Sequence, residues 1–515
     1  MAKLTVAENF SFDQTNFDFS NLFYGSSYAR SSTLFRVNYS DGVSEEFRGT
    51  GFTYDAYGVP YAGTVTSYGA TYNGQRLFLV EGGSVSASSI VAAADTWDLS
   101  DDAAVIMNVL RGNDTLTGGN LADIMMGYDG DDVINGNGGD DDLYGDAGND
   151  TIIGGKGADW IYGGAGSDTA SYATASTRVS ASLIDASSNT NDAKGDAYYD
   201  VENLLGSRFN DVLTGNAGGN VLMGGDGNDT LIGGASGDRL YGGNGSDTAS
   251  YASASAGVIA SLVAPKTNIG DAKGDIYSSI ENLSGSGFND VLAGDATANV
   301  LTGGSGNDTL VGGAGGDVLN GGAGSDTASY DSALASVKAN LADVASNTRD
   351  AKGDTYYSIE NLLGSSFGDA LTGGAGVNAL TGGDGNDVLS GGLGNDKLFG
   401  GAGADRHYGG TGTDRFIFKA VSESAGSTAD TIFDFSTSEL DKIDLSAIDA
   451  STTSAGDQAF SFIGANTFTG VAGQLRFDKL ASDTYIYADV NGDRVADFKV
   501  HLDDAITLTK DYFIV

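Results

Sequence analysis

Aspartate recurs at every ninth position along much of this chain, each time just after a glycine-rich stretch. The first run extends from Asp114 to Asp168 without a break, and three further runs lie between residues 211 and 414. A short fixed period is typical of stacked repeats, in which each repeat packs against its neighbours. This periodicity constrains the fold more than any other feature of the chain.

The local sequence at residues 154–162, GGKGADWIY, fits the pattern GGxGxDxUx of calcium-binding parallel β-helices, where U is usually aliphatic. Glycine can adopt backbone angles that are closed to other residues, so the turn is tight and its carbonyl groups can point inward. The aspartate adds a carboxylate. Ca²⁺ is a hard ion that binds roughly 6–8 oxygen atoms. We therefore predict that Ca²⁺ is bound by aspartate side chains together with glycine carbonyl groups.

The predicted calcium ligands are the aspartates of the nine-residue columns and the glycines of the best-matching turns. The aspartates are Asp114, Asp123, Asp132, Asp141, Asp150, Asp159, Asp168, Asp211, Asp229, Asp238, Asp247, Asp290, Asp308, Asp317, Asp326, Asp369, Asp387, Asp396, Asp405 and Asp414. The glycines are Gly155, Gly157, Gly164, Gly166, Gly225, Gly227, Gly304, Gly306, Gly313, Gly315, Gly383, Gly385, Gly392 and Gly394. The second column position of each later run is an asparagine, Asn220, Asn299 or Asn378. An amide is a weaker Ca²⁺ ligand than a carboxylate, so we expect weak or empty sites there.

The U residue lies two places after each aspartate and is predicted to point into the interior. These residues are Leu116, Ile134, Leu143, Ile152, Ile161, Leu231, Leu240, Leu310, Leu319, Leu389 and Leu398. Two nonapeptides then make one coil of turn, strand, turn and strand, with ions on the turn edges. The predicted fold class is all-β, a parallel β-roll or β-helix solenoid with β domains at both ends.

A longer period of 79 residues is superimposed on the short one. The sequence SDTASY at residues 167–172 returns at 246–251 and 325–330, and DAKGD at 192–196 returns at 271–275 and 350–354. We expect the segments between arrays to continue the stack as wider coils. The predicted domains are a β-rich cap at 1–105, a first array at 106–172, repeat units at 173–251, 252–330 and 331–414, and a closing β domain at 415–515.

Residues 1–105 differ in composition from the repeats. Phe10, Phe12, Phe17 and Phe19 alternate with polar residues, and residues 64–66 and 76–80 are predicted strands. Residues 52–60 suggest a hairpin, and 101–110 a short helix. We interpret the aromatic residues as core rather than as a ligand-stacking surface, because a repeat stack needs its open end covered.

The composition is strongly acidic, with 26 Lys and Arg against 69 Asp and Glu and a formal net charge of -43. Such a chain is repelled by phosphate backbones and anionic lipids, which argues against nucleic-acid and membrane-surface binding. There is no cysteine, so disulfide and thiolate metal sites are excluded. The first residues lack the apolar segment of a secretory signal, and no stretch reaches the roughly 20 apolar residues of a membrane span.

These arrays resemble the RTX repeats of proteins exported by the bacterial type I pathway, over roughly residues 106–515. The closing region, with DTIFDF at 430–435, DKIDLSAID at 441–449 and DVNGD at 489–493, is similar to the C-terminal domain of serralysin-type metalloproteases. The final residues 511–515, DYFIV, resemble the export signal of that family. The resemblance implies export from a Gram-negative cell by the type I machinery and folding in external Ca²⁺.

A separate short calcium loop is predicted at Asp489, Asn491, Asp493 and Asp497. The spacing of these oxygen side chains suits a loop with ligands at positions 1, 3, 5 and 9. Arg494 stands where such loops usually have glycine, so a plain aspartate-rich turn remains an alternative.

The sequence offers little for catalysis. Only His407 and His501 are present, far apart, so the zinc-binding HExxH motif of serralysins is missing. GSSFG at 364–368 matches the GxSxG motif of serine hydrolases, but the match arises from the repeat. His407 occupies a U position, where we interpret it as a tolerated substitution, and His501 as a surface strand residue.

We therefore expect a secreted calcium-binding protein that is not an enzyme and acts as an adhesive or structural element at the cell surface or in the matrix, with a cell-surface glycan as a candidate partner. The alternative is an enzyme or effector whose activity lies in residues 1–105. A pore-forming toxin ranks third, because long apolar helices are missing. Without Ca²⁺ the stacked carboxylates repel one another, and we expect the arrays to be unfolded or loosely collapsed.

Overall fold

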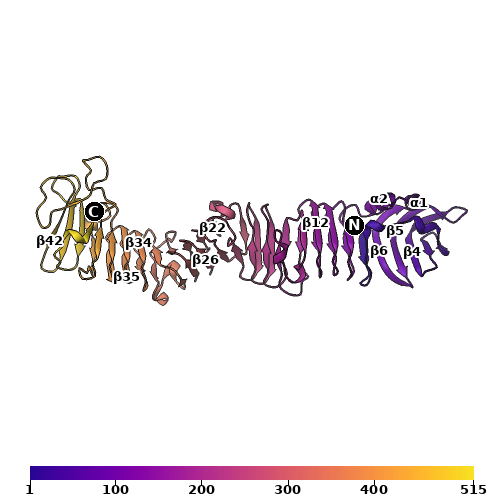
Figure 1. The fold of residues 1–515 in the computed structure, drawn as a ribbon, viewed down its shortest axis with the longest axis horizontal. Coiled ribbons are helices and arrows are strands. Elements are labelled where there is room, and N and C mark those ends of the chain that lie inside the picture. The colour runs from indigo at the N-terminus through magenta and orange to yellow at the C-terminus, as the bar shows by residue number, and fades with distance from the viewer. The chain divides into compact units, whose positions relative to one another are not determined.

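The computed structural model describes residues 1–515 and forms two compact bodies. The N-terminal body comprises residues 1–249 and 274–280, and the C-terminal body comprises residues 250–273 and 281–515. In each body the strands are stacked as rungs, one coil above the next (Figure 1). The only α-helices are α1 (Ala87–Ala94) and α2 (Leu99–Val109). Neither has the length and apolar character needed to span a bilayer.

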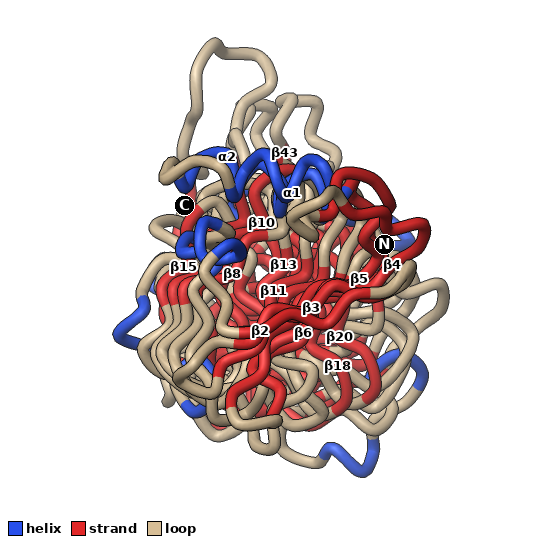
Figure 2. Tube along the Cα trace, turned by 90° about the vertical axis from the view of Figure 1, so that its right-hand side faces the viewer, coloured by secondary structure: helices blue, strands red, loops and turns tan.

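The first part of the N-terminal body is an antiparallel sheet with the strand order β2-β3-β4-β5-β6-β1. Its strands are β1 (Lys3–Val6), β2 (Ser27–Arg30), β3 (Leu34–Asn38), β4 (Val43–Tyr54), β5 (Pro60–Tyr72) and β6 (Gln75–Ser86). The predicted hairpin is present, with Tyr54 opposite Pro60. Helix α1 packs on β5 and α2 on β6 (Figures 1 and 2). The predicted helix at 101–110 corresponds to α2.

Residues 10–23 form turns and short 3-10 helices at Gln14–Asn16 and Ser20–Phe23, and the alternating phenylalanines do not mark a strand. The side chains of Asp13 and Asp18 accept hydrogen bonds from the backbone N–H groups of Thr15 and Ser20. Such local bonds favour turns over strands. The predicted aromatic core is nevertheless present, because Phe12, Phe17 and Phe19 are buried against the rings of Tyr68 and Phe78.

The repeats of the N-terminal body form parallel ladders with a step of 18 residues. Thr115 pairs with Val133, Val133 with Thr151, and Thr151 with Thr169. One ladder contains β7 (Thr115–Thr117), β9 (Val133–Asn135), β11 (Thr151–Ile153), β13 (Thr169–Ser171), β16 (Asn203–Leu205), β18 (Val221–Asp226), β20 (Arg239–Asn244) and β23 (Ile276–Ser278). The opposite strands are β8 (Ile124–Met126), β10 (Asp142–Ala147), β12 (Trp160–Ala165) and β15 (Ala197–Tyr199), then β14 (Ser180–Ser182), β17 (Val212–Thr214), β19 (Thr230–Ile232) and β21 (Thr248–Ser250). Two nonapeptides therefore make one coil.

The U residues fill the space between the two ladders. Every predicted U residue is at most 1% exposed. Burial of aliphatic side chains on one side of each short strand stabilises the stack, since successive side chains of a strand point to opposite faces.

The segment between the first two arrays is a wider coil. Thr169 pairs with Asn203, 34 residues on, and Trp160 pairs with Ala197, 37 residues on. The extra length includes short 3-10 helices at Ala186–Ser188 and Asn191–Ala193. The same steps occur in the C-terminal body, where Thr327 pairs with Asn361 and Val318 with Thr355.

The C-terminal body repeats this architecture. One ladder contains β22 (Ile259–Ser261), β25 (Val291–Ala293), β27 (Thr309–Val311), β29 (Thr327–Ser329), β32 (Asn361–Leu363), β34 (Ala379–Asp384), β36 (Lys397–Ala402), β38 (Arg415–Ile417), β40 (Lys442–Asp444) and β45 (Phe513–Ile514). Further strands are β24 (Asn282–Ser284), β26 (Val300–Ser305), β28 (Val318–Ala323) and β31 (Thr355–Tyr357), and then β30 (Lys338–Asn340), β33 (Ala370–Thr372), β35 (Val388–Leu393), β37 (Arg406–Thr411) and β39 (Asp430–Ile432).

The closing region extends both ladders. Strand β39 pairs with β44 (Phe498–Leu502), which is followed by antiparallel β43 (Thr484–Asp489) and β42 (Gln474–Lys479), with β41 (Ser461–Phe462) beside β42. Residues 513–514 form β45, which pairs in parallel with β40. The terminal apolar residues are therefore a sheet strand in the folded protein.

Candidate metal centres

The column aspartates form a continuous hydrogen-bonded ladder along each turn edge. Oδ1 of Asp132 accepts from the backbone N–H of Asp114 at 2.7 Å, and Oδ1 of Asp150 accepts from that of Asp132 at 2.7 Å. On the other edge, Oδ1 of Asp159 accepts from the N–H of Asp141 at 3.0 Å. One oxygen of each carboxylate therefore joins two coils and fixes the direction of the other.

The second oxygen, Oδ2, is buried and has no hydrogen-bond partner in most of these residues. They are Asp114, Asp132, Asp141, Asp150, Asp159, Asp168, Asp229, Asp238, Asp308, Asp317, Asp326, Asp387, Asp396, Asp405 and Asp414. Buried carboxylate oxygens without a partner are costly and rare in folded proteins. A row of them is therefore suited to bind cations.

The turn glycines shape a cradle around this free oxygen. A Cβ atom at Gly136 would collide with Oδ2 of Asp141 and would lie 2.7 Å from the carbonyl oxygen of Gly154 in the next coil. The same arrangement recurs at the first glycine of other turns, such as Gly303 and Gly382. All of the predicted ligand glycines have positive φ angles, for example 102° at Gly155 and 145° at Gly157, which a side chain would disfavour.

The donors around each cradle are carboxylate and carbonyl oxygens, the set that Ca²⁺ prefers. No nitrogen or sulfur ligand is present in these turns. The residues therefore fit Ca²⁺, which would bridge one coil to the next and neutralise the carboxylate column.

Burial also changes the acidity of the column. Burial, together with the charge of neighbouring carboxylates, raises the pKa of Asp132 to about 7 and that of Asp141 to about 8. Later coils behave alike, since burial raises the pKa of Asp229 and of Asp387 to about 7. In the absence of metal, protons therefore compete for these oxygens near neutral pH.

Four of the column aspartates differ from the rest, because the protein itself satisfies both carboxylate oxygens. Asp123 accepts from the N–H groups of Phe12 and Gly119. Asp211, Asp290 and Asp369 each accept from a serine N–H and hydroxyl group in their own turn, at Ser207, Ser286 and Ser365. The serine stands at the second turn position, where the other turns usually have glycine. The structure thus gives these aspartates a hydrogen-bonding role, and the serine is the sequence signal for it.

The column asparagines hold their coils together without a metal. Nδ2 of Asn220 donates to the carbonyl oxygen of Glu202 at 2.7 Å, and Oδ1 accepts from the N–H of Asn216 at 2.8 Å. Asn299 and Asn378 make the equivalent bonds. The amide therefore supplies a donor where the aspartates have a free oxygen, and weak or empty calcium sites at these turns stay a prediction.

The wide coils contain acidic residues that the nine-residue period did not identify. Oδ1 of Asp196 continues the ladder by accepting from the N–H of Asp159, while its Oδ2 accepts from the hydroxyl group of Tyr172 at 2.7 Å. Asp354 and Tyr330 repeat this pair at 2.8 Å. These aspartates are the last residue of each DAKGD segment, and the tyrosine ends each SDTASY segment. The recurrence of both segments every 79 residues was the sequence signal that could have identified this pair.

The nine-residue aspartate pattern also did not predict a second ladder of hydrogen bonds between coils. The residue before each column aspartate is often Asn or Asp, and its side chain accepts from the backbone N–H 18 residues later. Oδ1 of Asp131 accepts from the N–H of Asn149 at 2.8 Å, and Oδ1 of Asp140 accepts from that of Ala158 at 2.9 Å. These polar contacts order the turns independently of metal.

The predicted loop at Asp489, Asn491, Asp493 and Asp497 is internally hydrogen-bonded. Asp489 accepts from the N–H groups of Gly492 and Arg494, and Asp497 accepts from that of Val490. Arg494 adopts a φ of 72°. The loop brings Asp489, Asn491 and Asp497 together but leaves no buried oxygen without a partner, unlike the column turns.

Neither histidine lies in an HExxH arrangement. His501 is partly exposed on β44 and contacts Asp483 Oδ1 at 2.9 Å. His407 is fully buried on β37. Ser366, the serine of the GxSxG match, is exposed in a turn between strands and not at a strand-to-helix junction.

Comparison with known families identifies both predicted parts. Residues 357–515 match "Peptidase M10 serralysin C terminal". The "RTX calcium-binding nonapeptide repeat (4 copies)" matches residues 109–143, 117–152, 135–170, 199–231, 214–249, 278–310 and 293–328. These matches confirm calcium as the cofactor and the parallel β-roll as the fold, and they indicate a type I secreted, extracellular protein.

Among solved structures, the chain is similar to two subunits of the Azotobacter vinelandii mannuronan C5-epimerase. AlgE6R3 is 31% identical over 29% of this chain and 78% of its own, with a TM-score of 0.22. AlgE6R2 is 27% identical over 30% of this chain and 90% of its own, also with a TM-score of 0.22. The extracellular lipase LipA of Serratia marcescens is 20% identical, with 45% of this chain and 39% of the lipase covered and a TM-score of 0.18. No curated protein matches the chain.

Proposed function

We propose that this secreted RTX protein, which carries calcium-binding nonapeptide repeats and a serralysin C-terminal domain, is a non-enzymatic adhesive or structural element of the cell surface or matrix. Its C-terminal region would direct it to the type I export machinery. Ca²⁺ would then fold it outside the cell.

The observation that carries this proposal is the column of buried, unpartnered carboxylate oxygens in glycine cradles. Extracellular calcium modules typically bind at about 10⁻⁴–10⁻³ M. Sites of that affinity would stay empty in the cytosol and fill outside, so folding would follow export. The repeats would then supply a repetitive binding surface in place of an active site.

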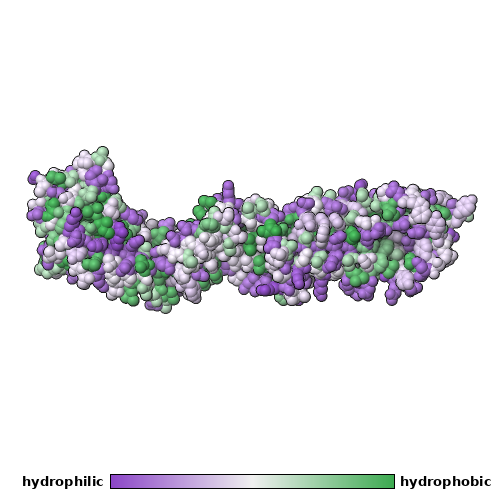
Figure 3. All heavy atoms as spheres, viewed as in Figure 1, coloured by the Kyte–Doolittle hydropathy of each residue, from purple (hydrophilic) through white to green (hydrophobic).

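An exposed aromatic ladder supports an adhesive role. The rings of Tyr144, Tyr162 and Tyr199 stack in successive coils with centroids 4.5 and 4.7 Å apart, and Trp160 lies beside them. Trp160 is 50% and Tyr199 43% exposed. The tyrosine faces pack on one another, so the exposed Trp160 and the last ring of the stack, Tyr199, are our candidate contacts for the apolar face of a sugar ring. Elsewhere, on the face drawn in Figure 3, apolar residues form small scattered patches.

The test compares the calcium-loaded protein with a Trp160→Ala/Tyr199→Ala variant on washed cells of the producing strain and on their extracted matrix polysaccharide. We expect retention of the parent protein in Ca²⁺, loss of retention with a chelator, and at least a tenfold weaker retention of the variant. Hydrolytic or lyase activity of the calcium-loaded protein on that polysaccharide would contradict a non-enzymatic role.

One observation favours the alternative, an activity in the N-terminal domain. A cavity of about 300 Å³ is lined by Phe10, Phe17, Asp18 and Glu45, among others. Burial raises the pKa of Glu45 to about 7, and its carboxylate accepts hydrogen bonds from the hydroxyl groups of Tyr39 at 2.8 Å and of Tyr68 at 3.3 Å. A carboxyl group that titrates near neutral pH suits acid–base chemistry.

Full-length Glu45→Gln distinguishes the two functions. If the domain is catalytic, an activity of the parent protein on cell-wall or matrix polysaccharide should fall at least a hundredfold in this variant, while its calcium-induced folding is unchanged. If the domain is only a cap, the two proteins should be equally inactive and equally retained.

A further inference from the structure

His407 is an unusual residue at an interior position of the coil. On β37 it pairs with Leu389 of the coil before and Ile432 of the coil after, both aliphatic. Its side chain is fully buried, with the rings of Phe416 and Phe418 each 6.1 Å away. Both ring nitrogens lack a hydrogen-bond partner. Burying an imidazole in this way is costly unless something else satisfies it.

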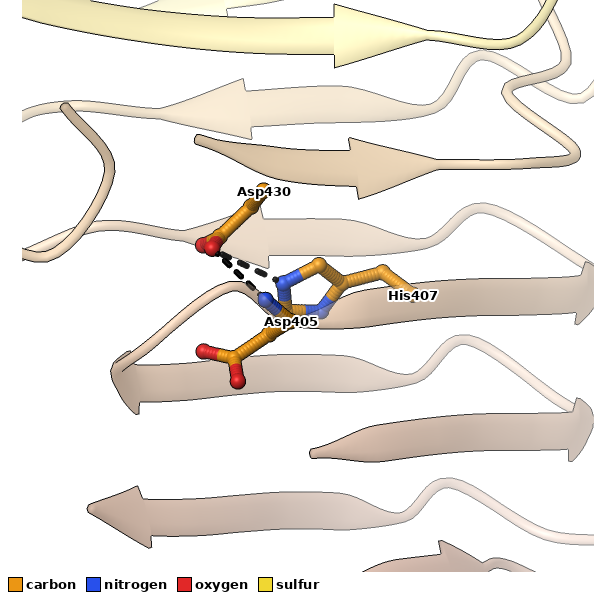
Figure 4. Close-up of side chains that lie close together, drawn as sticks. All are labelled: Asp405, His407 and Asp430. Atoms are coloured by element: carbon orange, nitrogen blue, oxygen red, sulfur yellow. Dashed lines mark hydrogen bonds and ion pairs between the residues drawn. The ribbon is translucent and has the colours of Figure 1, made fainter. Parts of the chain in front are cut away.

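Two carboxylates lie beside this imidazole. Oδ2 of Asp430 is 3.5 Å from Nε2 of His407, and Oδ2 of Asp405 is buried without a partner. One ligand atom from each of the three residues lies within 4.8 Å of the others. Figure 4 shows the imidazole between the levels of the two carboxylates. The backbone N–H of Asp405 donates to Oδ1 of Asp430 at 2.9 Å, which holds both acids in register.

The turn that leads into Asp430 differs from the calcium-binding turns. The residues before it, 425–429 with the sequence AGSTA, lack the GGxG turn. A Cβ atom at Gly426 would meet no atom within 4 Å, so there is no carbonyl cradle. A nitrogen donor replaces the missing oxygens.

The donor set is therefore one imidazole nitrogen and two carboxylate oxygens. Ca²⁺ prefers oxygen ligands only, whereas imidazole suits zinc and its neighbours among the transition metals. Zn²⁺ binds histidine nitrogen and carboxylate oxygen at about 2.0–2.2 Å, so donors on one ion lie up to about 4 Å apart. A small rotation of the side chains would bring the three donor atoms within reach of one ion.

We propose that Asp405, His407 and Asp430 bind one divalent cation of the zinc class, at the point where the last calcium coil meets the closing region. The ion links β37 to β39. It takes the place that an aliphatic side chain and a calcium turn take elsewhere in the stack. The site shares Asp405 with the end of the calcium column, and it requires the remaining coils to be folded by calcium.

The experiment uses the full-length protein, folded in saturating Ca²⁺ and freed of other metals. Zn²⁺ is titrated by calorimetry, and Co²⁺ by visible absorption, in parent protein and in His407→Leu. Leucine already occupies the equivalent positions 389 and 398, so this variant should fold. We expect one Zn²⁺ per parent chain that millimolar Ca²⁺ does not displace, and at least a hundredfold weaker binding in the variant. Calcium-induced folding, followed by circular dichroism, should be the same in both.

Matched variants identify the site. Asp430→Asn should weaken Zn²⁺ at least tenfold, while His501→Ala should leave it unchanged, because His501 belongs to a partly exposed group with Asp483 and Asp503. Equal Zn²⁺ binding by parent and His407→Leu, loss of binding only in His501→Ala, displacement of Zn²⁺ by Ca²⁺, or no binding by the folded parent would each overturn the proposal. Failure of calcium to fold the parent would instead contradict the proposed function.

Discussion

At the scale of single residues, the function of each column carboxylate depends on its second oxygen. Asp150 and Asp211 have the same spacing in the sequence, yet Oδ2 of Asp150 has no partner and Oδ2 of Asp211 is bound by Ser207. The spacing alone predicted calcium at both. The residue at the second turn position separates the two cases, because it is Asp146 before Asp150 and Ser207 before Asp211.

This difference leads to a matched pair of variants. Asp150→Asn should remove a calcium ligand, so the protein should bind fewer ions and need more Ca²⁺ to fold. Asp211→Asn should leave the number of bound ions unchanged and lower the free energy of unfolding by about 1–3 kcal/mol, through its lost hydrogen bonds. Ion counting by mass spectrometry and calcium-dependent circular dichroism measure both effects. An equal loss of ions in the two variants would contradict this assignment.

The acidity of the column predicts how pH acts on the metal-free protein. Folding raises the pKa of Asp132 to about 7 and of Asp141 to about 8, from about 3.9 in an unfolded chain. The folded state therefore binds more protons than the unfolded state between these values, and its stability falls as pH rises. This contribution is complete below about pH 4 and is lost as pH passes through 7 to 8.

Without Ca²⁺, we therefore expect more residual β structure at about pH 5 than at about pH 8. With Ca²⁺ the order should reverse, because protons compete with the ion, and more Ca²⁺ should be needed for folding at the lower pH. Circular dichroism at a series of pH values tests both trends. A metal-free protein that becomes more stable as pH rises would show that these carboxylates are not buried as described.

At the scale of elements, the repeating coil could be predicted and its interruptions could not. The nine-residue period gives the turns, and the U residues such as Ile134 and Ile152 give the interior, because both depend on local pattern. Helix α1 escaped prediction because its only clear signal is the cap at Ser86. The bond between Tyr172 and Asp196 joins residues 24 apart through a wide coil, and no local pattern indicates such a contact.

The tyrosine of the wide coil gives a prediction at this scale. Tyr172→Phe removes the hydroxyl group from a buried carboxylate and should lower the free energy of unfolding in Ca²⁺ by about 1–3 kcal/mol. Tyr199→Phe is the control, because its side chain is 43% exposed. Urea unfolding of the two variants in Ca²⁺ measures the difference. Equal stabilities would mean that the Tyr172 hydroxyl group does not stabilise the wide coil.

At the scale of the whole molecule, both ends of the carboxylate ladder have polar partners outside the repeats. Backbone N–H groups of Ala2 and Phe12 donate to Asp114 and Asp123 at the start. Asp430 and Asp441 accept from the N–H groups of Asp405 and Asp414 at the end. The sequence indicated that the ends of the stack need caps. It did not indicate which atoms bond to the ends of the ladder, because these contacts lie outside the nine-residue register.

The net charge of -43 is the property that connects structure and function. Carboxylates stacked about 4.8 Å apart repel one another strongly without a cation. Metal binding then contributes directly to the free energy of folding. A chain of this kind is suited to cross an export channel unfolded and to fold in external calcium.

The most direct test of this account is circular dichroism of the full-length, chelator-treated protein during a Ca²⁺ titration at neutral pH. We predict a cooperative transition from coil to β structure at about 10⁻⁴–10⁻³ M Ca²⁺, reversed by chelator. A spectrum that is already β-rich without metal and stays unchanged across that range would contradict the central claim that calcium holds the coils together.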